Sequence, residues 1–460
     1  MADIVFAGPS LPAAEAARLL PGARILPPIA HGDLLRLDPR PGDRVFIVDG
    51  LFLQAAPVRH REILHLLERG VTVAGSSSMG ALRAAELWPF GMRGHGEIFR
   101  MYRDGEVTGD DEVAIVHGPA DEGSKALSEP LVNIRIALRA AAAAGAVTAE
   151  EAGRLVELAR ALPFRLRGYR ALRHRARDLG DGSAERFLAW LARNPSDAKA
   201  ADARLMLRHA AAGPAPAPAP APAAADLPIE HVGTSYFTGW QARYGGAEHD
   251  GRFVTTAEVA GALMLLHPGF PEYHRRDVLA RVTGAGPEDP GLVEAAVAVA
   301  RSHGLLGPVP PRDLPEPSWL TPADRDLPDA DAALRVMVRA FGTVEHRCID
   351  QRLIPAALSG PAVRDAAAGI VATAAALNES IPRVSPQQPL RRRKFKPDVI
   401  DAWFARLWEC APADLEPAAW DRGFVNLHHF RIVAEPFVMY LKTFGRPAFP
   451  ATGRQPVSVG

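Results

Sequence analysis

A run of alternating proline and alanine, from Gly213 to Ala225, constrains the fold of this chain more than any other feature. Proline has a fixed φ and no backbone N–H, so the five prolines of the run cannot donate hydrogen bonds to a helix or a sheet. Such a segment is expected to form a stiff, extended spacer. The 460 residues are also too many for one hydrophobic core. The sequence therefore predicts two domains, residues 1–212 and 227–460, joined by a linker at 213–226.

The first domain alternates short β-rich runs with helical patterns. The runs are Ile4 to Ala7, Arg24 to Leu26, Arg44 to Val48, Val71 to Ala74 and a further candidate at Val113 to His117; the helical patterns are Pro12 to Leu20, Val58 to Arg69 and Met79 to Leu87. This alternation is typical of βαβ units. It predicts an α/β core at residues 1–140 with a mostly parallel sheet and flanking helices.

Apolar residues at three- and four-residue steps dominate the rest of the chain, which favours helices. Leu155, Leu158 and Leu162 illustrate the pattern in a predicted helical extension, residues 141–212, where Ser196 can cap the last helix. Beyond the linker the same periodicity predicts a mainly α-helical domain of unknown function. Its clearest boundary is a capping box formed by Thr255 and Glu258.

Composition narrows the classes of partner and cofactor. Lys plus Arg and Asp plus Glu both total 53, so no excess charge steers the chain toward nucleic acid or a membrane surface. Asp3 stands where a secretion signal would carry positive charge, and we expect a cytoplasmic protein. Cys348 and Cys410 are the only cysteines, and the adjacent His428 and His429 diverge on a helix. We expect no disulfide, no metal site and no cofactor.

The segment Gly75-Ser76-Ser77-Ser78-Met79-Gly80 lies between a predicted strand and a predicted helix. Hydroxyls and free N–H groups at a helix N-terminus can stabilise an anion or oxyanion. The ordinary interpretation is a helix cap, although three serines exceed what one cap needs. In α/β-hydrolases the nucleophilic serine has glycine two residues away on either side. Here Gly75 suits Ser77 but Met79 replaces the second glycine, while Ser78-Met79-Gly80 resembles the turn of Clp-type serine peptidases.

Several motifs, in a fixed order, resemble the TfuA family over about residues 3–140, with the helices up to 212 as a plausible continuation. They are Val5-Phe6-Ala7-Gly8-Pro9-Ser10-Leu11, Asp49-Gly50-Leu51-Phe52, His60-Arg61-Glu62-Ile63-Leu64, the stretch Gly75 to Leu87, Phe90-Gly91-Met92, Asp110-Asp111-Glu112-Val113-Ala114 and Leu127-Ser128-Glu129-Pro130-Leu131-Val132-Asn133. Each motif is short, but their shared order makes the resemblance specific.

The resemblance implies an accessory role in peptide backbone thioamidation during ribosomal peptide (RiPP) biosynthesis. The implied partners are a YcaO enzyme, a precursor peptide and a ThiS-like ubiquitin-like sulfur carrier. A Ser–Lys hydrolase would release sulfide from the carrier's C-terminal thiocarboxylate and supply it to YcaO. The alternative is a non-catalytic adaptor that recruits carrier or peptide to YcaO.

Mapped onto this sequence, the resemblance favours Ser78 as the nucleophile, with Ser77 as the alternative. Lys125 is the only one of five lysines inside the recognised region, and a lysine can lose a proton where arginine cannot. We therefore predict Lys125 as the base.

The carboxyl ends of parallel strands share one edge of a sheet, where ligands collect. The predicted substrate-binding residues near this edge are Ser10, Asp49, Gly50, Ser76, Gly80 and Arg83. Ser10 would bind the carrier tail or cap the first helix, and Asp49 would orient Lys125 or hold the turn beside Gly50. Arg83 would bind a carboxylate or form an exposed salt bridge.

Overall fold

The computed structural model describes residues 1–52, 55–118, 126–213, 234–307, 319–345, 349, 351–380 and 395–451. These residues form two compact units, 1–231 and 232–460, and each is described by itself. Most of the predicted linker (214–226), the predicted base Lys125 and Cys348 lie outside the described residues.

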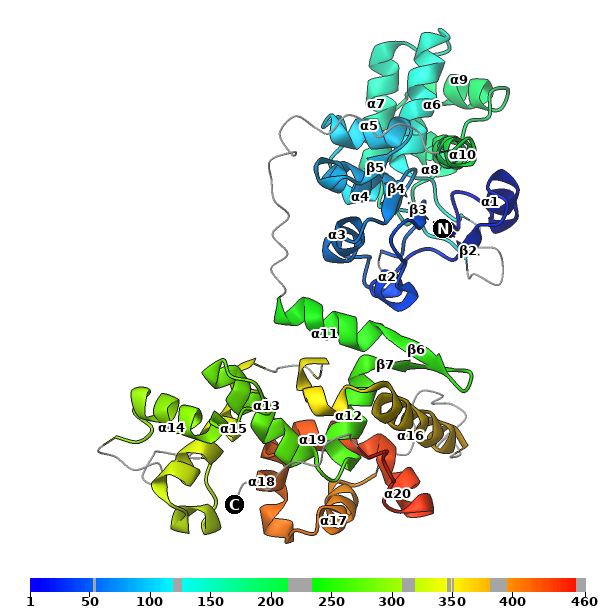
Figure 1. Ribbon diagram of the computed structural model, residues 1–460. Coiled ribbons are helices and arrows are strands. Elements are labelled where there is room, and N and C mark those ends of the chain that lie inside the picture. The colour runs from blue at the N-terminus through cyan, green and yellow to red at the C-terminus, as the bar shows by residue number, and fades with distance from the viewer. Residues whose placement is uncertain are drawn as a thin grey trace. The chain divides into compact units, whose positions relative to one another are not determined.

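The first unit is built on a parallel five-stranded sheet (Figure 1). Its strands are β1 (Asp3–Phe6), β2 (Arg24–Leu26), β3 (Arg44–Ile47), β4 (Thr72–Gly75) and β5 (Arg93–Gly94), in the order β2-β1-β3-β4-β5. The α/β prediction is confirmed. The candidate strand at Val113 to His117 is wrong: the edge beside β4 is taken by β5, and His117 makes only an isolated bridge to Ala126.

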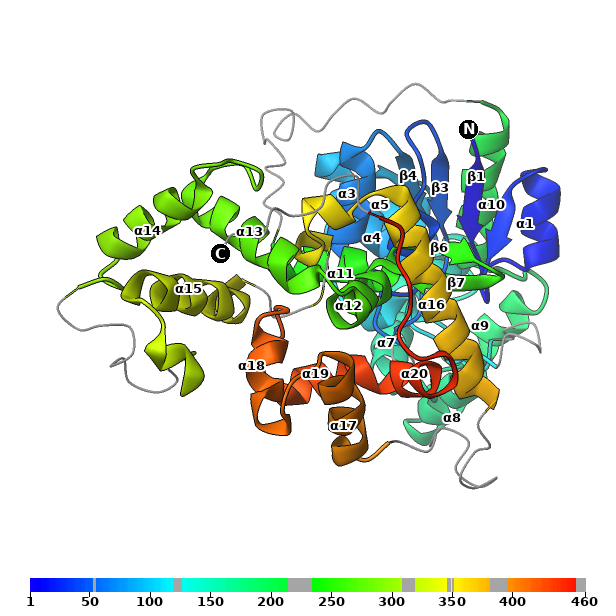
Figure 2. The same ribbon diagram turned by 60° about the horizontal axis from the view of Figure 1, so that its bottom comes forward.

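Helices cover both faces of this sheet, since successive strand residues point to opposite sides. Val5, Phe46 and Val48 pack against α1 (Ala13–Leu19) and α10 (Ala198–Ala211) (Figure 2). Ile4, Val45 and Ile47 face α2 (Asp33–Leu37), α3 (His60–Glu68), α4 (Met79–Leu87) and α5 (Glu97–Arg103). Helix α10 therefore belongs to the sheet core although it lies far beyond residue 140.

Between α5 and α10 the chain forms a small helical cluster. It consists of α6 (Leu131–Ala143), α7 (Ala149–Arg160), α8 (Tyr169–Asp178) and α9 (Ser183–Leu191) around a core of their own. The predicted cap Ser196 is wrong, because the Asp197 side chain accepts the Ala200 N–H and so caps α10. The side-chain oxygen of Asn133, from α6, also accepts the N–H groups of Ala198 and Lys199. Two side chains thus hold the N-terminus of α10 against α6.

Helix α4 starts in close contact with β3, and Gly80 makes this approach possible. A Cβ at position 80 would overlap the carbonyl oxygen of Ile47 in β3. The Gly80 N–H donates to the Val48 carbonyl at 3.3 Å. Any side chain at this position would therefore push α4 away from the sheet.

We expect Gly80→Ala to destabilise the first unit by about 3 kcal/mol, because a Cβ would overlap backbone that cannot move independently. Native-state hydrogen exchange at the amides of β1, β3 and β4 measures the effect. The matched control is Gly153→Ala in α7, where a Cβ would contact nothing within 4 Å. That control is expected to leave the free energy of unfolding unchanged or to raise it by up to about 1 kcal/mol. Equal protection in both variants would contradict this account of Gly80.

The second unit is mainly helical, as predicted, with one β-hairpin. Its elements are α11 (Ser235–Tyr244), β6 (Gly246–His249), β7 (Arg252–Thr255), α12 (Thr256–Leu266), α13 (Phe270–Thr283), α14 (Leu292–Ser302), α15 (Asp329–Glu345), α16 (Pro361–Ser380), α17 (Pro397–Leu407), α18 (Leu415–Trp420), α19 (Leu427–Ala434) and α20 (Val438–Phe444). Among the described residues, no helix is both long and apolar enough to cross a membrane.

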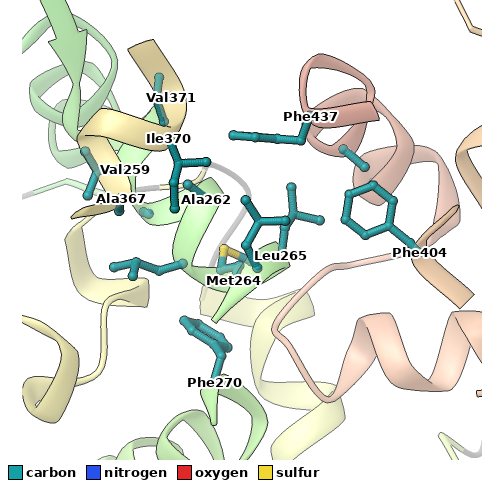
Figure 3. Packing of buried hydrophobic residues seen from close by; sticks show 14 of the residues in the cluster. Val259, Ala262, Met264, Leu265, Phe270, Ala367, Ile370, Val371, Phe404 and Phe437 are labelled. Carbon is teal, nitrogen blue, oxygen red and sulfur yellow. The ribbon is translucent and has the colours of Figure 1, made fainter. Parts of the chain in front are cut away.

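Helix α12 forms the centre of this second unit. The predicted capping box of Thr255 and Glu258 is present at its start. Every residue from Val259 to Leu266 is buried, and side chains such as Met264 and Leu265 lie among Phe270, Ile370 and Phe404 (Figure 3). A helix that is apolar on all sides must be enclosed by other helices. The second unit thus has a core independent of the sheet.

Candidate functional site

A pocket of about 650 Å³ opens at the carboxyl ends of β1, β3 and β4. It is lined by Pro9, Pro28, Asp49, Gly50, Leu51, Phe52, Ser78, Asp110, Asp111, Val113, Ala114, Ile115, Val116, His117, Phe164 and Arg165. Strand β2 lies on one side of β1, and β3 lies on the other side. The order in which the strands are added to the sheet therefore reverses at β1. Ligands of open α/β sheets bind at this kind of reversal. Of the predicted site residues, the structure brings Asp49, Gly50 and Ser78 together in this pocket.

Ser77 lies behind the pocket with its hydroxyl already engaged. Its side chain is fully buried and its Oγ donates to the Lys199 carbonyl at 2.7 Å. Its φ of 67° lies in the left-handed region, which is uncommon for a residue other than glycine. Ser76 is buried beside it, with 3.3 Å between the two Oγ atoms. The turn therefore holds Ser76 and Ser77 fully buried, whereas Ser78 keeps 8% of its surface exposed.

Ser78 is the serine that faces the pocket. It occupies the N-cap position of α4, yet its side chain makes no capping hydrogen bond, so the cap interpretation is wrong for this residue. The Ser78 carbonyl accepts the N–H groups of Ala81 and Leu82, and Ser78 is among the residues that line the pocket. Within the described part of the chain, neither the Ser78 hydroxyl nor the Met79 N–H has a hydrogen-bond partner. The Ser78 hydroxyl thus lies at the positive end of α4 beside the N–H of Met79, a fully buried residue that is not among those lining the pocket.

Asp49 holds the loop after β1. Its carboxylate accepts the N–H groups of Gly8 and Ser10 at 2.9 and 3.0 Å and the Ser10 hydroxyl at 2.6 Å. The interpretation of Ser10 as a cap of the first helix is wrong, because Pro12 is the N-cap of α1. Asp49 does hold a turn, but the turn is the one at residues 8–10. These bonds fix Pro9 and Asp49 on one wall of the pocket.

The remaining predicted residues have other surroundings. Gly50 lines the pocket, and a Cβ there would lie 2.7 Å from the Met79 side chain. Arg83 is buried on α4, where it pairs with Glu86 at 2.6 Å and donates to the Val58 carbonyl at 3.2 Å. The predicted salt bridge is present and partly buried, since Arg83 is buried and Glu86 is exposed, and Arg83 is not among the residues lining the pocket.

Lys199 is a residue that sequence reasoning missed. Its side chain is buried and its Nζ donates to the Val113 carbonyl at 3.0 Å, on the pocket wall. Burial lowers the pKa of this amine, against the opposing charges of Asp49, Asp197 and Glu129. The available signals were the scarcity of lysine in this chain and a lysine two residues after the cap Asp197. Neither signal reveals that α10 returns to the serine turn.

Internal ion pairs hold the opposite wall of the pocket. Arg135 binds both carboxylate oxygens of Glu112, at 2.9 and 2.8 Å. The buried Arg167 binds the Asp111 carboxylate and carbonyl and, at 3.0 Å, the Ala159 carbonyl. These contacts tie the 110–113 segment to α6 and α7. Among the described residues, no group of three or more His, Cys, Asp or Glu side chains is placed to hold a metal ion.

Comparison with known proteins identifies the region around the pocket. Residues 49–168 match the family model described as TfuA-like protein. No curated protein matches the chain. The matched segment contains Asp49, Gly50, the serine turn and the 110–117 wall, whereas Ser10 and Lys199 lie outside it. The resemblance predicted from the sequence motifs is confirmed: the first unit contains a TfuA-like domain.

Proposed function

We propose that the first unit is a serine hydrolase that cleaves the C-terminal thiocarboxylate of a ThiS-like sulfur carrier and supplies sulfide to a YcaO enzyme. TfuA-like proteins are associated with accessory functions in thioamidation. The observation that carries the proposal is Ser78, which lines the pocket at the start of α4 and whose hydroxyl has no hydrogen-bond partner among the described residues. A cap or a purely structural serine would use that hydroxyl within the protein.

In the proposed reaction the Ser78 hydroxyl attacks the thiocarboxylate carbon and loses its proton to a base. The Met79 N–H and the positive end of α4 stabilise the oxyanion that develops, which is often the largest catalytic contribution. Sulfide leaves with the proton, and water then hydrolyses the serine ester. The thiocarboxylate and one water thus give a carboxylate and hydrogen sulfide.

We propose Lys199 as the base of this reaction. A lysine acts as a base only when its amine is neutral, and burial shifts Lys199 in that direction. Its carbonyl accepts from Ser77, so its backbone contacts the serine turn. Its amine contacts Val113, which lines the pocket together with Ser78. Lys125 remains the candidate given by the family resemblance.

Sulfide release from a purified thiocarboxylated ThiS-like carrier, measured without YcaO, tests the proposal. The full chain is expected to release sulfide with multiple turnovers, at a rate at least a hundredfold above the rate without it. Absence of sulfide, with thioamidation by YcaO still dependent on this chain, would refute the hydrolase and support the adaptor. The control substrate is the same carrier bearing an ordinary carboxylate, which can release no sulfide.

A further inference from the structure

The wall of the pocket includes a short segment, residues 114–117. One of the two backbone edges of this segment is already hydrogen-bonded within the protein. The Val116 N–H donates to the Ser128 hydroxyl at 2.8 Å, and the Val116 carbonyl accepts from the Leu127 N–H at 2.8 Å. His117 then forms a bridge with Ala126 in antiparallel orientation. Residues 126–128 therefore form hydrogen bonds with the backbone of Val116 and occupy one edge of this segment.

Ile115 presents the other edge of the same segment. In an extended chain the backbone groups of successive residues point to opposite sides, so those of Ile115 point away from residues 126–128. Neither the N–H nor the carbonyl of Ile115 has a partner in the part of the chain that the structure describes. Ile115 lines the same pocket as Ser78. Ile115 thus brings to the wall of the Ser78 pocket a backbone donor and acceptor that no described residue pairs.

We propose that this edge binds the C-terminal tail of a partner protein as an added β-strand, with the last carbonyl of the tail at Ser78. Strand addition obtains its affinity from main-chain hydrogen bonds, which a single unpaired N–H and C=O pair can begin. A cavity of about 650 Å³ lies within the range of pockets that enclose a drug-sized ligand, which is room for the end of a peptide tail. The inference rests on the proposed function only for the identity of the reactive tail.

Exposed apolar residues beside the pocket favour a tail that belongs to a folded protein over a free small molecule. Leu127 is 65% exposed and contacts Val116 through its N–H. Leu166 is 69% exposed and follows Arg165, whose guanidinium lies 5.7 Å from the centre of the Phe164 ring. Arg165 and Phe164 both line the pocket. A partner whose tail enters the pocket can cover these leucines with its body.

Binding of a fluorescein-labelled hexa-alanine with a free carboxylate, measured by anisotropy with the full chain, tests the strand. This peptide resembles the reaction product, so the assay needs no turnover. We expect N-methylation of alternate peptide bonds to weaken binding about tenfold and methylation of the intervening bonds to change it less than threefold. Loss of affinity at every position, loss at none, or no binding of the unmethylated peptide would overturn the proposal.

Variants of the chain supply a second measurement. Ile115→Pro removes the N–H from the edge and is expected to weaken peptide binding about tenfold. Ile115→Ala keeps the N–H and is expected to stay within about threefold of the parent, which separates the backbone from the side chain. Equal affinities for the two variants would contradict strand addition. If the effect of N-methylation alternates along the peptide but the chain releases no sulfide, the strand site is supported and the hydrolase is refuted. If the chain releases sulfide but the effect of N-methylation does not alternate, only strand addition is refuted.

Discussion

Replacing Ser78 by alanine is expected to lower the rate of sulfide release from a thiocarboxylated carrier by at least about a thousandfold. Ser78 is the serine of the turn that lines the pocket, and no described group accepts a hydrogen bond from its hydroxyl. Without it, no serine ester can form on the enzyme. The measurement is the initial rate of sulfide release by the full chain at saturating carrier.

Two other serines serve as controls for this substitution. Ser302→Ala changes an exposed residue of the second unit and is expected to leave the rate unchanged. Ser77→Ala removes the hydrogen bond to the Lys199 carbonyl, so it is expected to lower the rate by about tenfold through misplacement of the turn. Full activity of Ser78→Ala, or a larger loss in Ser77→Ala, would contradict the assignment of the nucleophile.

Replacing Lys199 by methionine is expected to lower the same rate by about a thousandfold. Methionine keeps a long apolar side chain in the buried site but has no amine to take the Ser78 proton. The base must be neutral to act, so the rate of the parent chain is expected to rise with pH up to the pKa of Lys199. Burial lowers that pKa below the ordinary lysine value of 10.5, and this rising limb therefore lies below pH 10.5. Lys199→Met is expected to remove the limb from the profile of kcat/KM against pH.

Substitutions of two other lysines show whether the loss is specific to Lys199. Lys442→Met alters an exposed position on α20 and is expected to have no effect. Lys125→Met tests the base that the family resemblance indicates. Lys199 is a structural residue if Lys125→Met abolishes sulfide release while Lys199→Met still releases sulfide at a rate that rises with pH.

Local sequence patterns predicted the sheet and its serine turn because both depend on short-range physics. Alternating β-rich and helical segments placed β1 to β4, and the glycines around the serines placed the turn at the start of α4. The fifth strand was missed because Arg93 and Gly94 are only two residues with no apolar pattern. The apolar residues of the 113–117 segment instead line the pocket.

Long-range contacts could not be predicted from the same patterns. Ser77 and Lys199 are 122 residues apart in sequence, and the lysine reaches the turn only because α10 packs on the sheet. Ser10 likewise has a carboxylate partner 39 residues away, which replaced the helix cap suggested by its immediate neighbours. Lys199 lies outside residues 3–140, so the family resemblance did not point to this buried lysine.

Reaction with a fluorophosphonate probe measures the nucleophilicity of Ser78 directly. The full chain would be incubated with the probe, digested, and the modified residue located by peptide mass spectrometry. The account predicts one adduct, on the oxygen of Ser78, that forms more slowly in Lys199→Met and is prevented by the carboxylate peptide. An unmodified Ser78, or an adduct on Ser77 in its place, would contradict the claim that Ser78 is an activated serine in a peptide-tail pocket.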